Sequence, residues 1–548
     1  MKRSRAQHLL ASALQIAQLP AASAALYQSV VQTSYGPIQG LAAFSNATAA
    51  NISNWQNVGV WKGIPFAAST AGQNRWRPPQ PRAAWNTTLV ASSYGPGCPT
   101  TQGESATAGE DCLYLNIWSA ANSTTDKLPV ILWSHPAGGS SADALFDGGG
   151  MAAQNVVFVN YNYRDGVFGW LATPELSAEM GAANGNSSGN WGMLDQFAAL
   201  KWVHANIAAF GGDPDRITTV GQSAGSAAAY HMVNSPLVKG LIVGAIAESG
   251  VRDPYDPLAA SLAESYNNMT YSLSIGAAFL QANNATSIAQ LRAIPLASLT
   301  DTSSQPGSGA GFRPTLDGYA VPDKYINTLL KIGPANDVPF MTGNTRDESG
   351  ADFTLTSMNV SSYVAAMQAQ YGNATFGNSS TSLAARALAL YPAANASQAA
   401  MSYNAHWRDT SLVSSWKFAL GWATKANSSM YTYYWDHAPP GQNQGAHHMS
   451  EINYVFNNLY RTDLPWTADD YAIAKTMSAY WANFAKTGNP NLGGSYDGDG
   501  NLTWWNSTPG SANSTAVMHV GDGWGDVPIA EPGQIQLILD YFSEQVPF

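Results

Sequence analysis

Ser223 has the clearest potential for chemistry, because it is the central residue of the pentapeptide GQSAG at 221–225. The strand-like segment 217–220 precedes this pentapeptide, and a helix-like, alanine-rich segment follows it. In the G-x-S-x-G pattern the serine occupies a sharp strand-to-helix turn, where small neighbours let its hydroxyl project over the sheet edge. The start of the helix then faces the negative charge that develops when the serine attacks a carbonyl. The sequence therefore predicts a nucleophile at Ser223.

A second copy of the pattern, GNSSG at 185–189, lacks this context. No strand-like segment precedes it, and Asn186 within it begins an N-x-S/T glycosylation sequon. Such glycine-bounded polar segments are typical of surface loops. We expect Ser187 to lie in a loop and to take no part in catalysis.

A serine hydroxyl must lose its proton as it adds to a carbonyl. A histidine supplies the base, and a carboxylate holds that histidine in the correct tautomer and stabilises its protonated form. In α/β-hydrolases the acid and then the histidine follow the serine along the chain.

The elements that would position these residues are visible as alternating short apolar segments and helical patterns. Strands are expected at 130–133, 156–159, 217–220, 241–246, 339–342 and 431–435. Apolar residues between 194 and 207 recur close to the helical period of 3.6, and helical patterns fill much of 352–423. This alternation predicts an α/β fold with a central, mostly parallel, doubly wound sheet. The breaker-rich segments 303–311 and 493–500 are expected to be surface loops.

Composition limits the partners of this chain. Its 548 residues carry a net charge of −11, and only 11% of them are charged. Nucleic-acid recognition needs clustered lysine and arginine, so a nucleic-acid partner is not expected. At 45% hydrophobic residues, the chain can bury a large core, in one large domain with insertions or in two domains.

The amino terminus has the pattern of a secretory signal peptide. Three basic residues (Lys2, Arg3 and Arg5) precede the apolar stretch 9–19, and small residues at 22–24 offer a cleavage site. We therefore expect residues 1–24 to be removed and the protein to be extracellular. The alternative is an ordinary amino-terminal helix. The stretch is too short to span a bilayer, and no other segment predicts stable membrane insertion.

Sequons support secretion, and we expect a majority of them to be glycosylated. They begin at Asn46, Asn51, Asn86, Asn122, Asn186, Asn268, Asn284, Asn359, Asn373, Asn378, Asn395, Asn427, Asn501, Asn506 and Asn513.

Cys98 and Cys112 are the only cysteines, and in an oxidising compartment we expect them to form a disulfide. Two cysteines at this spacing do not supply a metal site, and the only histidine cluster is the adjacent pair His447 and His448. A catalytic metal is not expected.

Over nearly the whole mature chain, the sequence resembles the type-B carboxylesterases, the α/β-hydrolase family that includes cholinesterases and several fungal lipases. The shared motifs are WKGIPFA (61–67), EDCLYLNIW (110–118), NYR (162–164) with FG (168–169), NWGMLDQ (190–196), FGGDP (210–214), the serine pentapeptide and ESG (248–250). The resemblance implies one α/β-hydrolase domain over 25–548 with large helical insertions and no cofactor.

The resemblance also places the acid and the base. The family's acid is the glutamate of a G-x-x-x-D-E-G segment, which reads GNTRDES at 343–349 and points to Glu348, with Asp347 as the rival. The family's histidine precedes x-x-[DE]-[IL], and His448 fits this register in HMSEI (448–452), whereas His447 does not. The implied triad is Ser223, His448 and Glu348.

The oxyanion hole is where this chain departs from the family. The usual His or Tyr, three glycines and an aromatic residue are replaced by HPAGGS at 135–140. In a gap-free match the donor amides are those of Ala137 and Gly138, with Ala224 as the third. Ala137 can serve only if its backbone avoids positive φ. A slip of one residue would assign Gly138 and Gly139 instead.

Two further departures bear on the substrate. Gly139 and Ser140 replace the aromatic residue and should widen the acyl side of the pocket. Cys98 and Cys112 match the family's first disulfide, but the loop between them is short and has no aromatic residue, unlike a lipase lid or a choline-binding loop.

We therefore expect a secreted serine carboxylesterase that acts on a small-molecule ester. Its substrates should be soluble short, medium, bulky or aromatic esters. The alternatives are a repurposed acyltransferase or an enzyme acting on a biosynthetic intermediate, and less plausibly a lipase or a non-catalytic adhesion relative.

Overall fold

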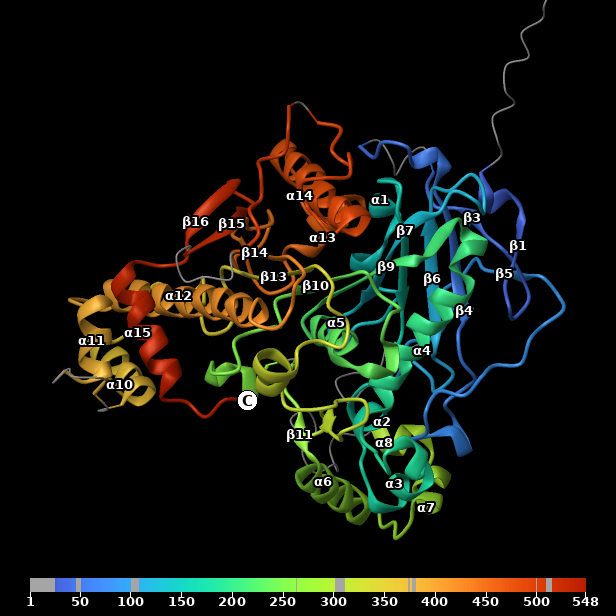
Figure 1. Cartoon of the computed structure of the whole chain (residues 1–548), viewed down its shortest axis with the longest axis horizontal. Coiled ribbons are helices and arrows are strands. Elements are labelled where there is room, and N and C mark those ends of the chain that lie inside the picture. Colours follow the sequence, from blue (N-terminus) through green and yellow to red (C-terminus); the bar gives the residue numbers. More distant parts are fainter. Residues whose placement is uncertain are drawn as a thin grey trace, which may run out of the picture.

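The computed structural model describes residues 25–45, 51–99, 108–262, 264–300, 311–372, 375–376, 381–498, 500–508 and 515–548. The segments expected as a signal peptide (1–24) and as most of one surface loop (303–310) lie outside these residues. An eleven-stranded sheet crosses the middle of the molecule (Figure 1). From edge to edge its strands are β16 (Gly525–Pro528), β15 (Ala516–Val520), β14 (Met430–Trp435), β13 (Phe340–Thr345), β10 (Gly244–Glu248), β9 (Gly212–Gln222), β7 (Leu128–Ser134), β8 (Val157–Tyr161), β6 (Tyr114–Ser119), β4 (Gly59–Pro65) and β3 (Leu41–Ala42).

The seven strands from β15 to β8 run parallel to one another, and antiparallel strands close both ends of the sheet. All six expected strands overlap observed ones, which confirms the α/β architecture. Of the expected starts, that of the strand at 241–246 is too early, because this strand begins at Gly244. The Leu241 amide instead donates to the Val238 carbonyl, so a turn occupies the first expected positions.

Shorter strands form two small sheets, with β1 (Val30–Gln32), β2 (Pro37–Gln39) and β5 (Leu89–Val90) in one and β11 (Asn267–Asn268) and β12 (Thr315–Leu316) in the other. The helices are α1 (Gly149–Ala152), α2 (Gly166–Trp170), α3 (Pro174–Met180), α4 (Trp191–Asn206), α5 (Ala224–Asn234), α6 (Met269–Ala282), α7 (Ile288–Ala293), α8 (Leu296–Thr300), α9 (Tyr325–Asn327), α10 (Val360–Tyr371), α11 (Leu383–Leu390), α12 (Ala396–Trp422), α13 (Ile452–Val455), α14 (Ala468–Thr487) and α15 (Pro532–Ser543).

Helices cover both faces of the large sheet, and alternate residues of β7 show how. Val130 and Leu132 belong to a buried cluster with side chains of α4 and α5. Ile131 and Trp133 belong to a second cluster, with side chains of α13 and α14. A strand buried on both faces is a continuous apolar run, which explains the VILW sequence at 130–133.

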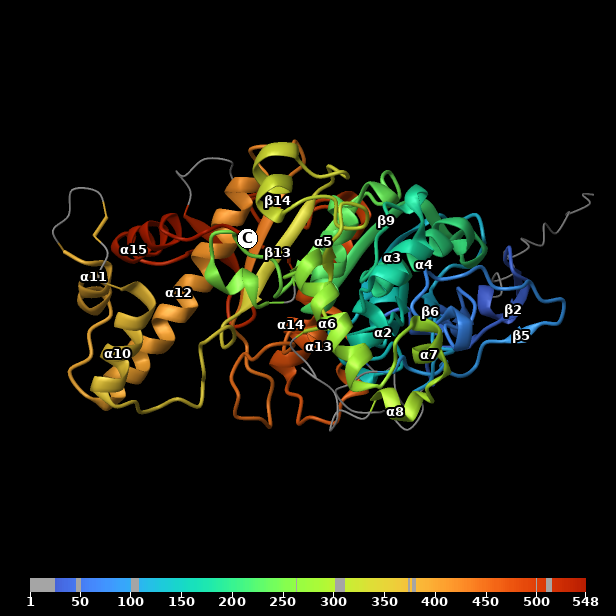
Figure 2. The same ribbon diagram turned by 90° about the horizontal axis from the view of Figure 1, so that it is seen from below.

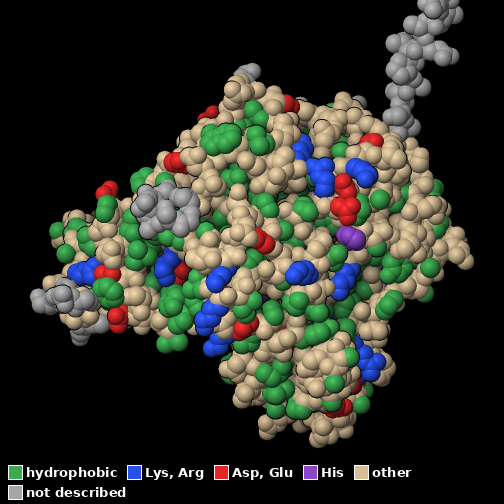
Figure 3. Space-filling model, viewed as in Figure 1, with side chains coloured by type: hydrophobic (Ala, Val, Ile, Leu, Met, Phe, Trp, Pro, Cys, Tyr) green, Lys and Arg blue, Asp and Glu red, His purple; other side chains and the backbone are tan. Residues whose placement is uncertain are grey.

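The helical insertions predicted from 352 to 423 become α10, α11 and α12. Together with α15 they extend beyond one end of the sheet (Figures 1 and 2). A separate buried cluster joins residues of α2, α3, α6, α7 and α8. Charged side chains are thinly scattered over the face shown in Figure 3, as the low charged fraction of the sequence implies.

Candidate active site

Ser223 lies on a strained turn between the end of β9 and the start of α5. Its φ of 56° and ψ of −121° are unfavourable for a residue with a side chain. The two glycines of the motif allow this turn. A Cβ on Gly225 would overlap the Ser134 carbonyl oxygen, and one on Gly221 would overlap the Gly225 carbonyl oxygen. The turn presents Ser223 on the wall of a cavity.

His448 and Glu348 lie at the same edge of the sheet as this turn. Glu348 follows β13, which is parallel to β9, so both strands deliver their carboxyl ends to this edge. The Nδ1 atom of His448 lies 2.6 Å from Oε2 of Glu348, whose Oε1 accepts a hydrogen bond from the Thr345 amide at 3.0 Å. Nε2 of Gln222, the residue before Ser223, lies 3.3 Å from Nε2 of His448. Among the described residues no hydrogen bond joins Ser223 to His448.

The contact between His448 and Glu348 shifts the pKa of each residue. Burial alone would lower the pKa of His448, but the hydrogen bond and negative charge of Glu348 outweigh burial and raise it. Burial alone would raise the pKa of Glu348, but the hydrogen bond and charge of His448 outweigh burial and lower it. The pair therefore stabilises a protonated imidazole beside an ionised carboxylate, which is what a histidine base needs after it has accepted a proton.

The rival residues have structural partners instead. The carboxylate of Asp347 makes ion pairs with Arg346 and Arg408 and accepts the Ala446 amide at 2.8 Å. It therefore anchors the segment that carries His448. The Nδ1 atom of His447 lies 3.3 Å from the carbonyl oxygen of Gly445 in its own loop.

Two adjacent backbone amides after β7 make no hydrogen bond within the described structure and can donate to a ligand. In the described part of the chain, the amides of Ala137 and Gly138 have no acceptor, whereas the Gly139 amide donates to the Pro136 carbonyl at 3.2 Å. Ala137 is exposed and does not have a positive φ, while Gly138 has a φ of 72°. Ala224 is the first residue of α5, where a helical amide has no partner within the helix. The geometry favours the gap-free register, since the Gly139 amide is occupied.

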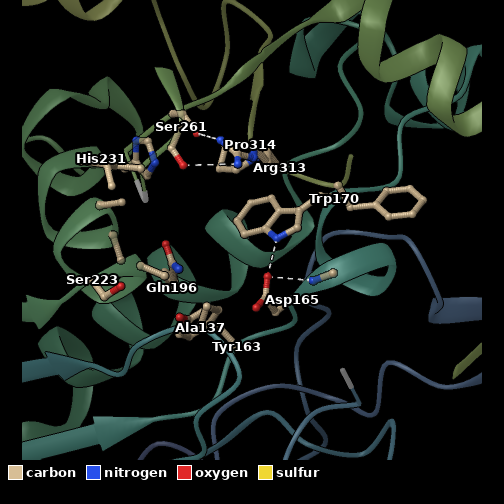
Figure 4. Close-up of a pocket in the computed structure, with 17 residues that line it drawn as sticks. Ala137, Tyr163, Asp165, Trp170, Gln196, Ser223, His231, Ser261, Arg313 and Pro314 are labelled. Atoms are coloured by element: carbon tan, nitrogen blue, oxygen red, sulfur yellow. Dashed lines mark hydrogen bonds between the residues drawn. The ribbon is translucent and has the colours of Figure 1, made fainter. Parts of the chain in front are cut away.

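A cavity of about 320 Å³ opens at Ser223 (Figure 4). Ala137, Gln196 and Ser223 line one end, and His231, Ser261 and Arg313 line the other. Trp170 and Arg313 also line the cavity, and no sequence motif pointed to either residue. Gln196 ends the NWGMLDQ motif, so a signal for it was present.

The proposed widening at Gly139 and Ser140 is not seen in this cavity, because neither residue lines it. A Cβ on Gly139 would instead lie 3.2 Å from the Phe146 ring and 3.2 Å from the His135 ring. This position of the loop packs against the protein, so an aromatic residue missing from it does not enlarge the space described here.

Two more glutamates are buried close to Ser223, His448 and Glu348. Burial raises the pKa of both Glu248 and Glu451. Oε1 of Glu248 accepts a hydrogen bond from the Trp481 indole at 2.6 Å, and the Ser223 amide donates to the Glu248 carbonyl at 2.9 Å. Burial therefore favours the uncharged form of both side chains, and Glu348, which hydrogen-bonds to the ring, has the larger effect on His448.

The predicted disulfide between Cys98 and Cys112 is confirmed, with a Cα–Cα distance of 4.9 Å. Much of the loop that it closes (100–107) lies outside the described residues. No cluster of three or more His, Cys, Asp or Glu side chains in the described ranges could hold a metal ion. The described helices include none that is both long and apolar enough to cross a membrane.

Comparison with known proteins identifies the class. Residues 27–525 match the sequence model of the carboxylesterase family. The chain is 34% identical to a fumonisin B1 esterase of Sphingopyxis macrogoltabida over 80% of each chain. It is 32% identical to the para-nitrobenzyl esterase of Bacillus subtilis, over 84% of this chain and 90% of that one. The solved carboxylesterase of Geobacillus stearothermophilus superposes with a TM-score of 0.70 and 29% identity, over 93% of this chain and 99% of that one.

The fold is thus that of the α/β-hydrolases, with a serine on the characteristic turn. The chain belongs to the carboxylesterase family and is a carboxylic ester hydrolase.

Proposed function

We propose that this protein is a secreted serine esterase whose triad is Ser223, His448 and Glu348. One observation carries the assignment. The strained Ser223 turn lies at the sheet edge where His448 forms its 2.6 Å hydrogen bond with Glu348. This bond occupies Nδ1 and leaves Nε2 as the ring atom available to accept the serine proton.

Hydrolysis follows in two stages. Oγ of Ser223 attacks the ester carbonyl while His448 takes its proton, and His448 then gives that proton to the departing alcohol. This leaves an acyl group on Ser223. Water loses a proton to His448 as it attacks the acyl carbonyl. The C–O bond to Ser223 then breaks, His448 returns the proton to Oγ of Ser223, and the free acid leaves. Glu348 keeps its negative charge throughout and stabilises protonated His448.

The oxyanion of each tetrahedral intermediate would be held by the amides of Ala137, Gly138 and Ala224. Their fixed N–H groups cost no reorganisation when charge develops, and loss of one such donor typically costs a factor of about 10² to 10³ in rate. The unpaired state of the two loop amides and their place next to the cavity support this assignment.

We propose soluble short, medium, bulky or aromatic esters as substrates. Trp170 and Phe312 give the cavity aromatic walls, which suit an aromatic or branched group. A related enzyme is named for a para-nitrobenzyl ester, in keeping with such a pocket.

The triad assignment is tested by covalent labelling. A serine-directed phosphonate should abolish hydrolysis of short p-nitrophenyl esters, and peptide mapping should find the label on Ser223. A label on Ser187 or any other serine would refute the nucleophile assignment.

Secretion is supported by the placement of the sequons. Every sequon asparagine in the described ranges is exposed, namely Asn51, Asn86, Asn122, Asn186, Asn268, Asn284, Asn359, Asn395, Asn427, Asn501 and Asn506. The buried asparagines, such as Asn116, Asn160 and Asn344, do not begin sequons. Secreted material should lose mass on treatment with an N-glycosidase, and its amino terminus should be Ala25. An unprocessed amino terminus on unglycosylated protein would contradict secretion.

A further inference from the structure

The cavity at Ser223 changes character from one end to the other. Ala227 and Ala228 lie one turn along α5 from Ser223 and make its wall apolar. The other end adds polar groups to the lining, namely Ser261 and Arg313 (Figure 4), with Ser265 hydrogen-bonded to Arg313. A substrate that fills this cavity from Ser223 therefore meets a guanidinium at its far end.

Arg313 stands out among the arginines because no carboxylate in the described part of the chain pairs with it. Of the twelve described arginines, ten form ion pairs with carboxylates, and only Arg216 and Arg313 do not. Arg216 donates to the Lys486 carbonyl, and it does not line this cavity. Arg313 is half-buried and lines the same cavity as Ser223.

The bonds that Arg313 does make are to uncharged acceptors. Its Nη1 donates to the Ser265 hydroxyl and, at 3.4 Å, to the Ala260 carbonyl, and its Nη2 donates to the Ser261 carbonyl at 3.3 Å. A guanidinium has five N–H donors, so these three bonds fix its position and leave donors for a ligand.

The neighbouring titratable groups do not cancel this charge. Glu264 is buried, and burial raises its pKa to about 8, so it is mostly uncharged at neutral pH. Burial lowers the pKa of His231 to about 3, so that ring is neutral. Asp165 also lines the cavity, but its Oδ1 accepts hydrogen bonds from the Gly166 amide at 2.7 Å and the Trp170 indole at 2.6 Å, and it forms no ion pair with Arg313. The far end of the cavity therefore carries a guanidinium that no described carboxylate pairs with.

We propose that Arg313 binds a free carboxylate on the ester substrate, so that the enzyme prefers half-esters of dicarboxylic acids or other esters with a second, ionised acid group. The inference rests on the proposed function, because it takes Ser223 as the point of attack. A carboxylate is the natural ligand, since it can accept two parallel N–H bonds from one guanidinium. The chain's net charge of −11 opposes anions in general, so the preference must come from this local site.

Two matched substrate pairs test the proposal. Monomethyl adipate and methyl hexanoate differ by a carboxylate on the acyl side, and 4-acetoxybutanoate and butyl acetate differ by one on the alcohol side. In at least one pair the wild-type kcat/KM should favour the carboxylate ester, and the preference should weaken with added salt. Arg313→Gln should lower kcat/KM for that ester by about 10- to 100-fold, mainly through KM, with less than about a twofold change for its neutral partner.

Control variants separate binding from folding. Arg313→Lys keeps the charge but loses the two-pronged geometry, so it should retain part of the preference. Arg216→Gln removes the other described arginine without an acidic partner. It should leave kcat/KM unchanged for both members of each substrate pair. Adipate should inhibit the wild-type enzyme competitively and Arg313→Gln much more weakly.

The proposal is overturned if Arg313→Gln slows both members of each pair equally, since Arg313 would then only hold the 260–265 segment. Wild-type preference for the neutral ester in both pairs would also overturn it. In either case Ser223-dependent hydrolysis of methyl hexanoate would leave the proposed function intact. Hydrolysis that persists in Ser223→Ala would overturn the proposed function and this inference together.

Discussion

Two serines in this chain have the same G-x-S-x-G pattern and opposite surroundings. Ser223 follows an eleven-residue strand, has a positive φ and lies on a cavity wall. Ser187 lies between the short helix η5 (Ala182–Asn184) and α4, is only 3% exposed, and donates a 2.5 Å hydrogen bond to Asp317. The pattern is the same in both places, but only at Ser223 do a strand and a helix form the turn that the proposed nucleophile needs.

The same lesson applies to the neighbouring acids Asp347 and Glu348. Asp347 is held by two arginines and a backbone amide, whereas Glu348 accepts from the histidine ring. A one-residue offset past β13 thus separates a carboxylate that anchors a loop from one that hydrogen-bonds to the His448 ring.

The largest expected effect separates the two serines. Ser223→Ala should lower kcat by a factor of about 10⁶, as loss of a triad serine does, with the fold intact by circular dichroism. Ser187→Ala should keep full kcat and lose about 1 kcal/mol of unfolding free energy, because Asp317 loses a hydrogen-bond partner. Hydrolysis of p-nitrophenyl butyrate measures kcat, and urea denaturation measures the free energy of unfolding. Comparable activity in the two variants would contradict the assignment of Ser223 as the nucleophile.

The second effect separates the two acids. Glu348→Gln should lower kcat by a factor of about 10⁴, because the amide cannot stabilise protonated His448. Asp347→Asn should retain kcat within about tenfold and instead lower the melting temperature, because two ion pairs are weakened. The proposal for Glu348 would fail if Asp347→Asn were the inactive variant.

Sequence alone predicted much of the central sheet, because strands buried on both faces are apolar runs. The segments around 130–133 and 217–220 have this property and were placed correctly. Edge strands such as β16 (Gly525–Pro528) were not foreseen, since their alternate residues are only half-buried and carry little apolar signal. The helix α14 was also missed, although Thr467 and Asp470 form the capping box that begins it.

Within the site, motifs were enough to predict Ser223, His448 and Glu348 as a triad, but the cavity could not be predicted. Arg313 is 90 residues from Ser223 along the chain, and only the folded structure brings it to the same cavity. The widening predicted at Gly139 stays a prediction, since Gly139 does not line the cavity at Ser223 and a Cβ there would face Phe146.

The pH dependence of kcat/KM should also distinguish Glu348 from Asp347. Only neutral His448 accepts the serine proton, so kcat/KM should fall about tenfold per pH unit below the pKa of this residue. Because Glu348 raises that pKa, the midpoint should lie above 6.5 rather than at the lower end of the histidine range. In Glu348→Gln the midpoint should move to lower pH, because the stabilising charge is gone and burial remains. Asp347→Asn should leave it nearly unchanged, and an equal shift in both variants would contradict the assignment.

The smallest expected effect is the absence of a jump in rate. The family relatives include bile salt-activated lipases, one from Bos taurus at 32% identity, so the distinction between esterase and lipase must be tested on this chain. A lid that opens on lipid needs a long amphipathic segment, and only 13 residues, mostly small and polar, separate Cys98 from Cys112. The rate of hydrolysis of tributyrin should therefore rise smoothly as its concentration passes the solubility limit, and monomeric short esters should be preferred to emulsified long-chain triglycerides. A sharp rise at the solubility limit would show that another segment acts as a lid, and the reading of Ser223 as an open site for dissolved esters would be wrong.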